Sequence, residues 1–311
     1  MSEEVEEKLS HIPILGKLFA WMKTIILPGF AGLSLYDFWE LYSFGIIKGT
    51  FSTRASAIAF SFFMALFPFF LFILNLIPYV PISDFQTEFL IFIQNLLPAQ
   101  TADFFEPILL DIAANPRGGL LSLTLIFSIF LMANGVNAIF TGFEFSYHTS
   151  INRSIIRQYF VALGVSLILA LLLLLTVIII LYYQYTIGEL KSRGILNEEN
   201  RWISQLGSFV FFVVLIYCVV GTLYYFGTKE GKSYRFLSGG ALMTTLLFLL
   251  TTYFFGIYIN NFSNYNQLYG SVGALLIMMV YIWLNSNLLL LGFELNATLY
   301  KLKYKHEHKI N

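Results

Sequence analysis

The sequence predicts an all-α polytopic membrane protein with six transmembrane helices, and three observations support this fold class. Hydrophobic residues make up 58% of the chain and charged residues 12%, which is about half the charged share of a soluble domain. The mean hydropathy is +0.74. Six apolar stretches are long enough to cross a bilayer, and basic residues are concentrated on one side of them. A bilayer accommodates this much apolar surface, whereas a soluble fold would expose it to water.

The six stretches each approach or exceed the roughly 20 apolar residues that a membrane-spanning helix needs. They cover residues 56–78, 120–143, 159–183, 206–226, 236–259 and 271–299. The third contains the run LILALLLLLTVIIILYY, and none alternates polar and apolar residues as strands do. The last is longer than one crossing requires, so we expect it to tilt or to extend into the cytoplasm.

Lysine and arginine place both termini in the cytoplasm, because cytoplasmic loops of membrane proteins are enriched in these residues. With a cytoplasmic N-terminus and six spans, 14 of the 18 basic residues fall on the inner side. The outer side then holds only Arg117, Lys191, Arg193 and Arg201. The orientation therefore follows from charge, without reference to any motif.

Residues 1–53 are predicted to be a cytoplasmic segment with helices at the membrane interface. Apolar residues recur at helical spacing over 9–26, with lysines between them. A second helix is expected to start at Ser34, with Asp37 three residues later as a capping pair. Trp39 and Tyr42 suit the level of the lipid headgroups. The sequence leaves open whether these helices lie in the interface or pack on the bundle.

The remaining chain divides into a six-helix membrane domain, 54–300, and a basic cytoplasmic tail, 301–311. Within the domain, the outer loop 79–119 contains two amphipathic stretches separated by Pro98. We expect an outer helical hairpin, either half sunk in the interface or capping a cavity.

Polar side chains inside the second span are candidates for function, because burying them in a bilayer is costly. Asn134, Asn137, Thr141 and Glu144 are spaced three, four and three residues apart, so they share one helix face. They are predicted to line a cavity or transport path. The alternative is that they bond to neighbouring helices and only hold the bundle together.

The sixth span carries a second group of polar residues near its middle. Asn285 and Asn287 flank Ser286, and both asparagines are further candidates for lining the path. Asn287 shares a face with Glu294 and Thr298. Glu294 lies within the apolar span, so it should be either paired or hydrated.

Three charged residues, Arg54, Glu144 and Glu294, are expected near the inner boundary by topology. We predict a charge cluster of these three that closes the inner end of a cavity. The alternative is that each side chain extends separately to water.

No catalytic constellation is recognisable, so the sequence predicts neither an enzyme nor a bound cofactor. The four histidines, His11, His148, His306 and His308, lack metal-ligand spacing with carboxylates of a span. No phosphate-binding glycine loop is present, and no serine or cysteine has a plausible base nearby. Because the net charge is zero, nothing favours a nucleic acid as partner. Membrane lipids are the expected partners, with a homo-oligomer or a partner protein left open.

Three segments resemble the YihY/BrkB family of bacterial inner-membrane proteins, in the order in which that family has them. They are TRASAIAFSFFMALFPFFLF in the first span, ANGVNAIFTGFEFSYH at the second span, and YGSVGALLIMMVYIWLNSNLLLLGFELNATL in the sixth. The resemblance runs from about Trp39 to Tyr300 and leaves out the KHEHK tail. It implies six spans with cytoplasmic ends in the inner (plasma) membrane, which agrees with the charge pattern.

The resemblance also implies a role in the cell envelope, such as moving lipids or lipid-linked molecules or exporting solutes. Family members were once labelled ribonuclease BN, but the short cytoplasmic loops and the lack of a metal site argue against that activity here. The polar spans and Pro68 inside the first span favour transport of a lipid or amphipathic molecule. A small-solute channel or exporter and a non-transporting scaffold are the alternatives.

Overall fold

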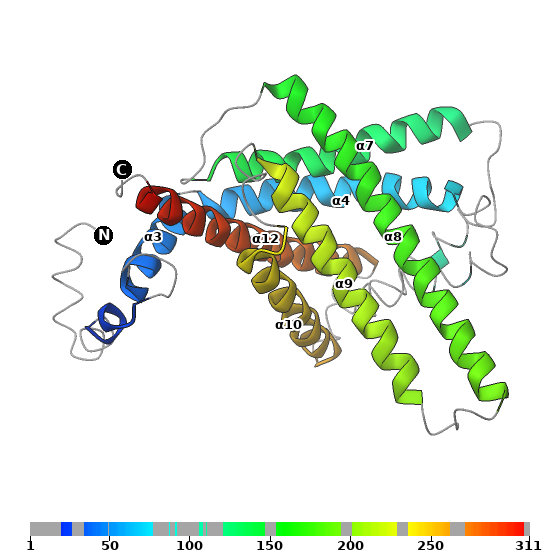
Figure 1. Cartoon of the computed structure of the whole chain (residues 1–311). Coiled ribbons are helices and arrows are strands. Elements are labelled where there is room, and N and C mark those ends of the chain that lie inside the picture. The colour runs from blue at the N-terminus through cyan, green and yellow to red at the C-terminus, as the bar shows by residue number, and fades with distance from the viewer. Residues whose placement is uncertain are drawn as a thin grey trace.

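A computed structural model of the chain confirms the all-α fold class (Figure 1). It describes residues 20–26, 34–48, 50–76, 87, 91, 106–107, 110, 121–146, 154–193, 201–228, 236–261 and 271–307. Residues 1–19 and most of the predicted outer hairpin, 79–119, lie outside these ranges, so the hairpin and the proposed domain boundaries stay predictions.

Among the described residues, five helices are long and apolar enough to cross a membrane. They are α7 (Leu121–Glu144), α8 (Ile155–Ser192), α9 (Arg201–Gly227), α10 (Gly239–Asn261) and α12 (Ser271–Glu307). The first predicted span falls on α4 (Phe51–Leu76), a 26-residue helix that continues through Pro68. Its first part, Phe51–Leu66, is an apolar helix shorter than a full membrane crossing needs. The described residues therefore contain five candidate spans, and the number six remains a prediction.

Two helices are much longer than the bilayer is thick. At a rise of about 1.5 Å per residue, the 38 residues of α8 extend about 57 Å, against a hydrocarbon core of about 30 Å. The predicted third span, 159–183, is therefore only the middle of this helix. The 37-residue α12 continues to Glu307, so most of the predicted tail, 301–311, is a helical extension of the last span.

The helices form two crossing groups (Figure 1). In that view α4, α7 and α12 run in one general direction, and α8, α9 and α10 cross them at an angle. Within the first group α4 packs against both α7 and α12, and the two groups are connected because α8 packs on α7 and α10 packs on α12. A further helix, α3 (Leu35–Lys48), lies against α12.

The principal core lies at one end of the bundle. Its members come from the first part of α4, α8 and α10 and from the second half of α7, α9 and α12: Ala55, Ile58, Val136, Ile139, Phe140, Phe143, Ala162, Val165, Val220, Leu223, Tyr224, Ala241, Leu289, Leu290, Phe293 and Ala297. Because successive spans alternate in direction, these ends meet on one side, which the charge pattern predicts to be the inner side. This cluster joins six of the described helices on that side.

An aromatic stack forms the centre of this core. The rings of Phe143 on α7 and Phe293 on α12 are parallel, with centroids 4.2 Å apart. Tyr224 on α9 meets both rings edge-on. Its hydroxyl donates to the carbonyl of Leu289 at 2.7 Å and lies 2.6 Å from the hydroxyl of Thr244 on α10. The Tyr224 hydroxyl is therefore hydrogen-bonded although it lies in an apolar core.

Helices α10 and α12 cross at glycines. A Cβ atom at Gly292 would overlap the Thr244 hydroxyl, and one at Gly240 would overlap the Gly292 carbonyl. A side chain of α12 also caps the start of α10 at this crossing. Asn296 Oδ1 accepts a hydrogen bond from the backbone N–H of Gly240 at 2.8 Å. The absence of both side chains therefore permits the close approach of the two helices.

The N-terminal part of the chain confirms the predicted capping pair. The carboxylate of Asp37 accepts hydrogen bonds from the N–H and the hydroxyl of Ser34, and Ser34 Oγ accepts from the N–H of Asp37. The sequence left open whether this helix lies in the membrane interface or packs on the bundle. In the structure α3 packs on the bundle, against α12. Trp39 is exposed, whereas Tyr42 is buried.

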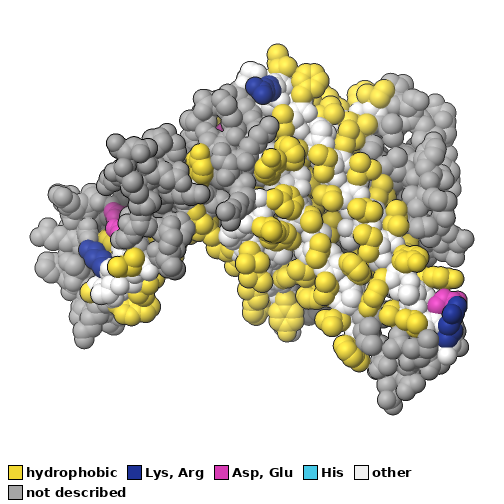
Figure 2. Space-filling view, in the orientation of Figure 1, with side chains coloured by type: hydrophobic (Ala, Val, Ile, Leu, Met, Phe, Trp, Pro, Cys, Tyr) yellow, Lys and Arg dark blue, Asp and Glu magenta, His cyan; other side chains and the backbone are white. Residues whose placement is uncertain are grey.

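Hydrophobic side chains cover the face formed by α8, α9 and α10, as Figure 2 shows, and the charged side chains on view lie at its margins. Exposed large residues on these helices include Leu171, Leu175, Phe209, Val210, Leu246 and Leu250. Such an apolar surface suits contact with lipid acyl chains.

Candidate functional site

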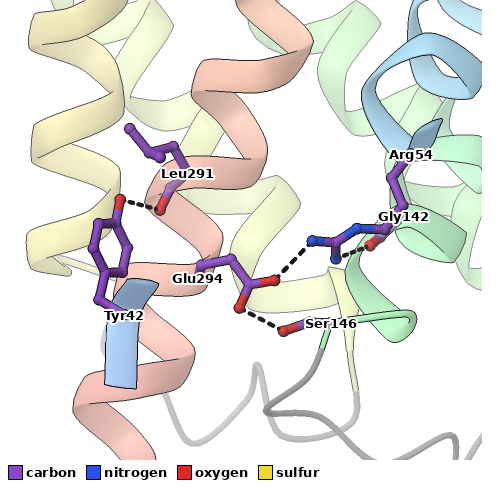
Figure 3. A network of polar contacts seen from close by, with 6 residues as sticks. All are labelled: Tyr42, Arg54, Gly142, Ser146, Leu291 and Glu294. Carbon is purple, nitrogen blue, oxygen red and sulfur yellow. Dashed lines mark hydrogen bonds and ion pairs between the residues drawn. The ribbon is translucent and has the colours of Figure 1, made fainter. Parts of the chain in front are cut away.

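An arginine and a glutamate form a buried ion pair where α4, α7 and α12 meet (Figure 3). Arg54 Nη2 donates to Glu294 Oε1 at 2.8 Å, and the two side chains are 5% and 0% exposed. Both charges are thus removed from water, which is tolerable only because they are paired. Ser146, just after α7, donates its hydroxyl to the other carboxylate oxygen of Glu294 at 2.7 Å.

Arg54 also caps the end of α7. Its Nη1 donates to the carbonyl of Gly142 at 2.9 Å, one of the last carbonyls of α7, which lack partners within the helix. A positive side chain at the C-terminal end of a helix is favoured by the helix dipole. The Nε atom of Arg54 is buried and has no hydrogen-bond partner in the described structure, so the guanidinium is held through its two terminal nitrogens.

Tyr42 brings α3 to the same region. Its hydroxyl donates to the carbonyl of Leu291, one turn before Glu294, at 3.1 Å (Figure 3). Burial, and secondarily the negative charge of Glu294, raises the pKa of the Tyr42 hydroxyl. The hydroxyl therefore stays protonated at neutral pH and acts as a donor.

The third predicted member of the charge cluster, Glu144, is the buried last residue of α7. Its described hydrogen bonds involve Gln158 on α8. With the amide nitrogen of Gln158 facing Glu144, an orientation assigned from hydrogen bonding, that nitrogen lies 2.7 and 3.1 Å from the two carboxylate oxygens. The structure thus pairs Arg54 with Glu294 and connects Glu144 to α8. A cluster of all three stays a prediction.

Most of the polar face of α7 also converges on Gln158. The amide oxygen of Gln158 accepts from Thr141 at 3.0 Å and lies 3.2 Å from the side-chain amide of Asn137. These contacts match the alternative in which polar residues hold the helices together. Asn134 differs, because its side chain is exposed and has no hydrogen bond in the described structure.

The polar residues of α12 bond mainly to their own helix. Asn285 donates to the carbonyl of Tyr281 at 2.8 Å, and Asn287 donates to the carbonyl of Trp283 at 2.7 Å. Ser286, which lies between them, donates in the same way to the carbonyl of Ile282. Their proposed role in lining a path remains untested by these contacts.

Sequence reasoning did not find Ser146, Gln158 or the Gly142 carbonyl as members of these networks. Gln158 had a usable signal, since it is a polar residue at the entrance of an apolar span. Ser146 and Gly142 had none, because a serine after a helix and a backbone carbonyl are common. Among the residues that the structure describes, no three of His, Cys, Asp or Glu are grouped to hold a metal ion.

The fold and this site define a class: a polytopic helical membrane protein with an ion pair buried at one end of its bundle. The family model described as virulence factor BrkB matches residues 46–311. The chain therefore belongs to the BrkB family, also called YihY. The match reaches the last residue, so it includes the tail that the resemblance had left out.

Relatives of the chain differ widely in how much of it they share. It is 28% identical over 255 residues to the ribonuclease-like protein YfkH of Bacillus subtilis (strain 168), covering 81% of this chain and 90% of YfkH. It is 36% identical over 90 residues to a UPF0761 membrane protein of Psychrobacter sp. (strain PRwf-1), covering 29% of this chain and 16% of that protein. No solved structure matches the chain significantly.

Proposed function

We propose that this protein is a transport-type protein of the inner (plasma) membrane that moves a lipid or an amphipathic cell-envelope molecule. In this proposal the Arg54–Glu294 pair holds the inner end of the bundle closed. No chemical step is required, and the absence of enzymatic activity stays a prediction; incubation of the purified protein with RNA would test its ribonuclease part.

The observation that carries the proposal is the buried ion pair next to the principal core. All members of the principal core, and the buried ion pair, lie at the end predicted to face the cytoplasm. The described parts of α8, α9 and α10 expose large apolar and aromatic side chains along their length, including Phe160, Leu175, Phe209 and Phe254. Alternating-access transporters close one side of the bundle while the other is open. In this proposal a substrate with acyl chains moves along the apolar surface that faces the lipid.

Purified protein in vesicles of phosphatidylethanolamine and phosphatidylglycerol, with a trace of lipid labelled on its headgroup by a nitrobenzoxadiazole dye, tests this function. Added dithionite bleaches only the outer leaflet, so about half the fluorescence survives in protein-free vesicles. We expect the protected half to be lost over time when the protein is present. Vesicles holding an unrelated helical membrane protein serve as the control.

Entrapped carboxyfluorescein in the same vesicles separates the alternatives. Lipid movement with retained dye supports the proposal. Dye release without faster lipid movement would favour the small-solute channel or exporter instead. If neither lipid movement nor dye release occurs in vesicles that contain the protein, a non-transporting scaffold explains it better.

The orientation in the proposal has its own test. A fluorescent protein fused after Asn311 is expected to fluoresce, and alkaline phosphatase at the same position to be inactive, because the phosphatase folds only outside the cytoplasm. The same two reporters inserted between α8 and α9 should give the opposite result. Active phosphatase at the C-terminus would contradict the charge-based topology.

A further inference from the structure

Asn134 presents an unpaired amide to the membrane. It lies ten residues before Glu144, the last residue of α7, or about 15 Å along the helix and thus near the middle of a hydrocarbon core of about 30 Å. Its side chain is exposed and makes no hydrogen bond in the described structure. Its helical neighbours Phe127, Phe130 and Leu131 are also exposed, so the amide stands in an apolar stripe.

An amide cannot find water at this depth, and an unsatisfied polar group in hydrocarbon costs free energy. The other asparagines described inside the spans avoid this cost. Asn137 lies beside the Gln158 amide, and Asn285 and Asn287 bond to carbonyls of α12. Asn134 makes no such bond in the described structure, so a hydrogen-bonding partner outside the chain would offset the cost of its amide.

We propose that the stripe formed by Phe127, Phe130, Leu131 and Asn134 is a homodimer interface, in which Asn134 bonds to Asn134 of a second copy. A side-chain amide has both donors and an acceptor, so it is complementary to itself across a two-fold axis. Two copies inserted with the same topology place this residue at the same depth, which no other partner does automatically. The proposal is independent of the transported substrate.

The test is dimerisation of the full-length protein in lipid vesicles, measured by single-molecule photobleaching of a C-terminal label over a range of protein-to-lipid ratios. Asn134→Leu is expected to weaken dimerisation about three- to thirtyfold, the range for interhelical hydrogen bonds of polar residues in membranes. Asn287→Leu is the matched control, since it removes an amide from another span whose hydrogen bond is internal, and it should leave the dimer unchanged.

Cross-linking locates the interface independently. In a Cys218→Ser background, Asn134→Cys is expected to form a disulfide-linked dimer on oxidation, whereas Leu171→Cys, exposed on α8, is not. A monomeric wild-type protein in lipid would overturn the proposal. So would an Asn134→Leu protein that dimerises like the wild type, even if it loses lipid movement, because Asn134 would then contact the substrate rather than a second copy.

Discussion

Replacing Arg54 by methionine is expected to destabilise the folded protein by about 3–5 kcal/mol, because Glu294 would be left as a buried charge without its partner. Glu294→Met should cost a similar amount, since the guanidinium of Arg54 is equally removed from water. The double variant is expected to lie within about 2 kcal/mol of the wild type, as apolar replacements of buried ion pairs are often neutral. The measurement is the free energy of unfolding in mixed micelles for all four proteins of the cycle.

A second ion pair in the same chain provides the control. Arg193 lies 3.4 Å from Glu189, with side chains 71% and 45% exposed. Water screens this pair, so Arg193→Met should change stability by less than about 1 kcal/mol. If the double variant at Arg54 and Glu294 lost as much free energy of unfolding as the two single variants together, the two residues would not be coupled. Other contacts would then have to close the inner end of the bundle.

Gly292→Ala is expected to disrupt the crossing of α10 and α12, with a loss of about 3 kcal/mol. The added Cβ would overlap the Thr244 hydroxyl, and it would also lie 2.5 Å from the Tyr224 hydroxyl and 2.8 Å from the Gly240 carbonyl. A backbone carbonyl cannot rotate away as a side chain can, so the helices themselves must separate. This separation would also strain the hydrogen bond from Tyr224 to Leu289.

Gly256→Ala on α10 is the matched control, because no atom lies within 4 Å of the position of its Cβ. Alanine is the better helix former by about 1 kcal/mol, so this variant should be as stable as the wild type or slightly more stable. Thermal unfolding in detergent, together with the yield of monodisperse protein, distinguishes the two variants. Equal behaviour of the two would contradict the close crossing at Gly292.

Local rules predicted the parts of the fold that depend on neighbours in the chain. Runs of about 20 apolar residues located the helices, and the spacing of Ser34 and Asp37 located the start of α3. The pairing requirement of Glu294 followed from one carboxylate in an apolar span. The ends of α8 and α12 could not be located in this way, because a helix can continue past the bilayer wherever its residues allow.

The candidate site required more than local rules. That Asn137 and Thr141 meet Gln158 while Asn134 stays exposed depends on where α8 crosses α7, and all three share one helix face in the sequence pattern. Spacing determines a face, but only a neighbouring helix determines which part of that face is covered.

The sequence alone determined that this chain is a helical membrane protein, because the cost of placing polar groups in lipid acts on every residue regardless of its neighbours. Only the tertiary structure decided that Arg54 pairs with Glu294, that Ser146 completes the pair, and that Gly292 lies at a helix crossing. These contacts join residues far apart in the chain at distances near 3 Å. Such distances are set by how α4, α7 and α12 pack, and helix packing depends on all the surfaces in contact at once.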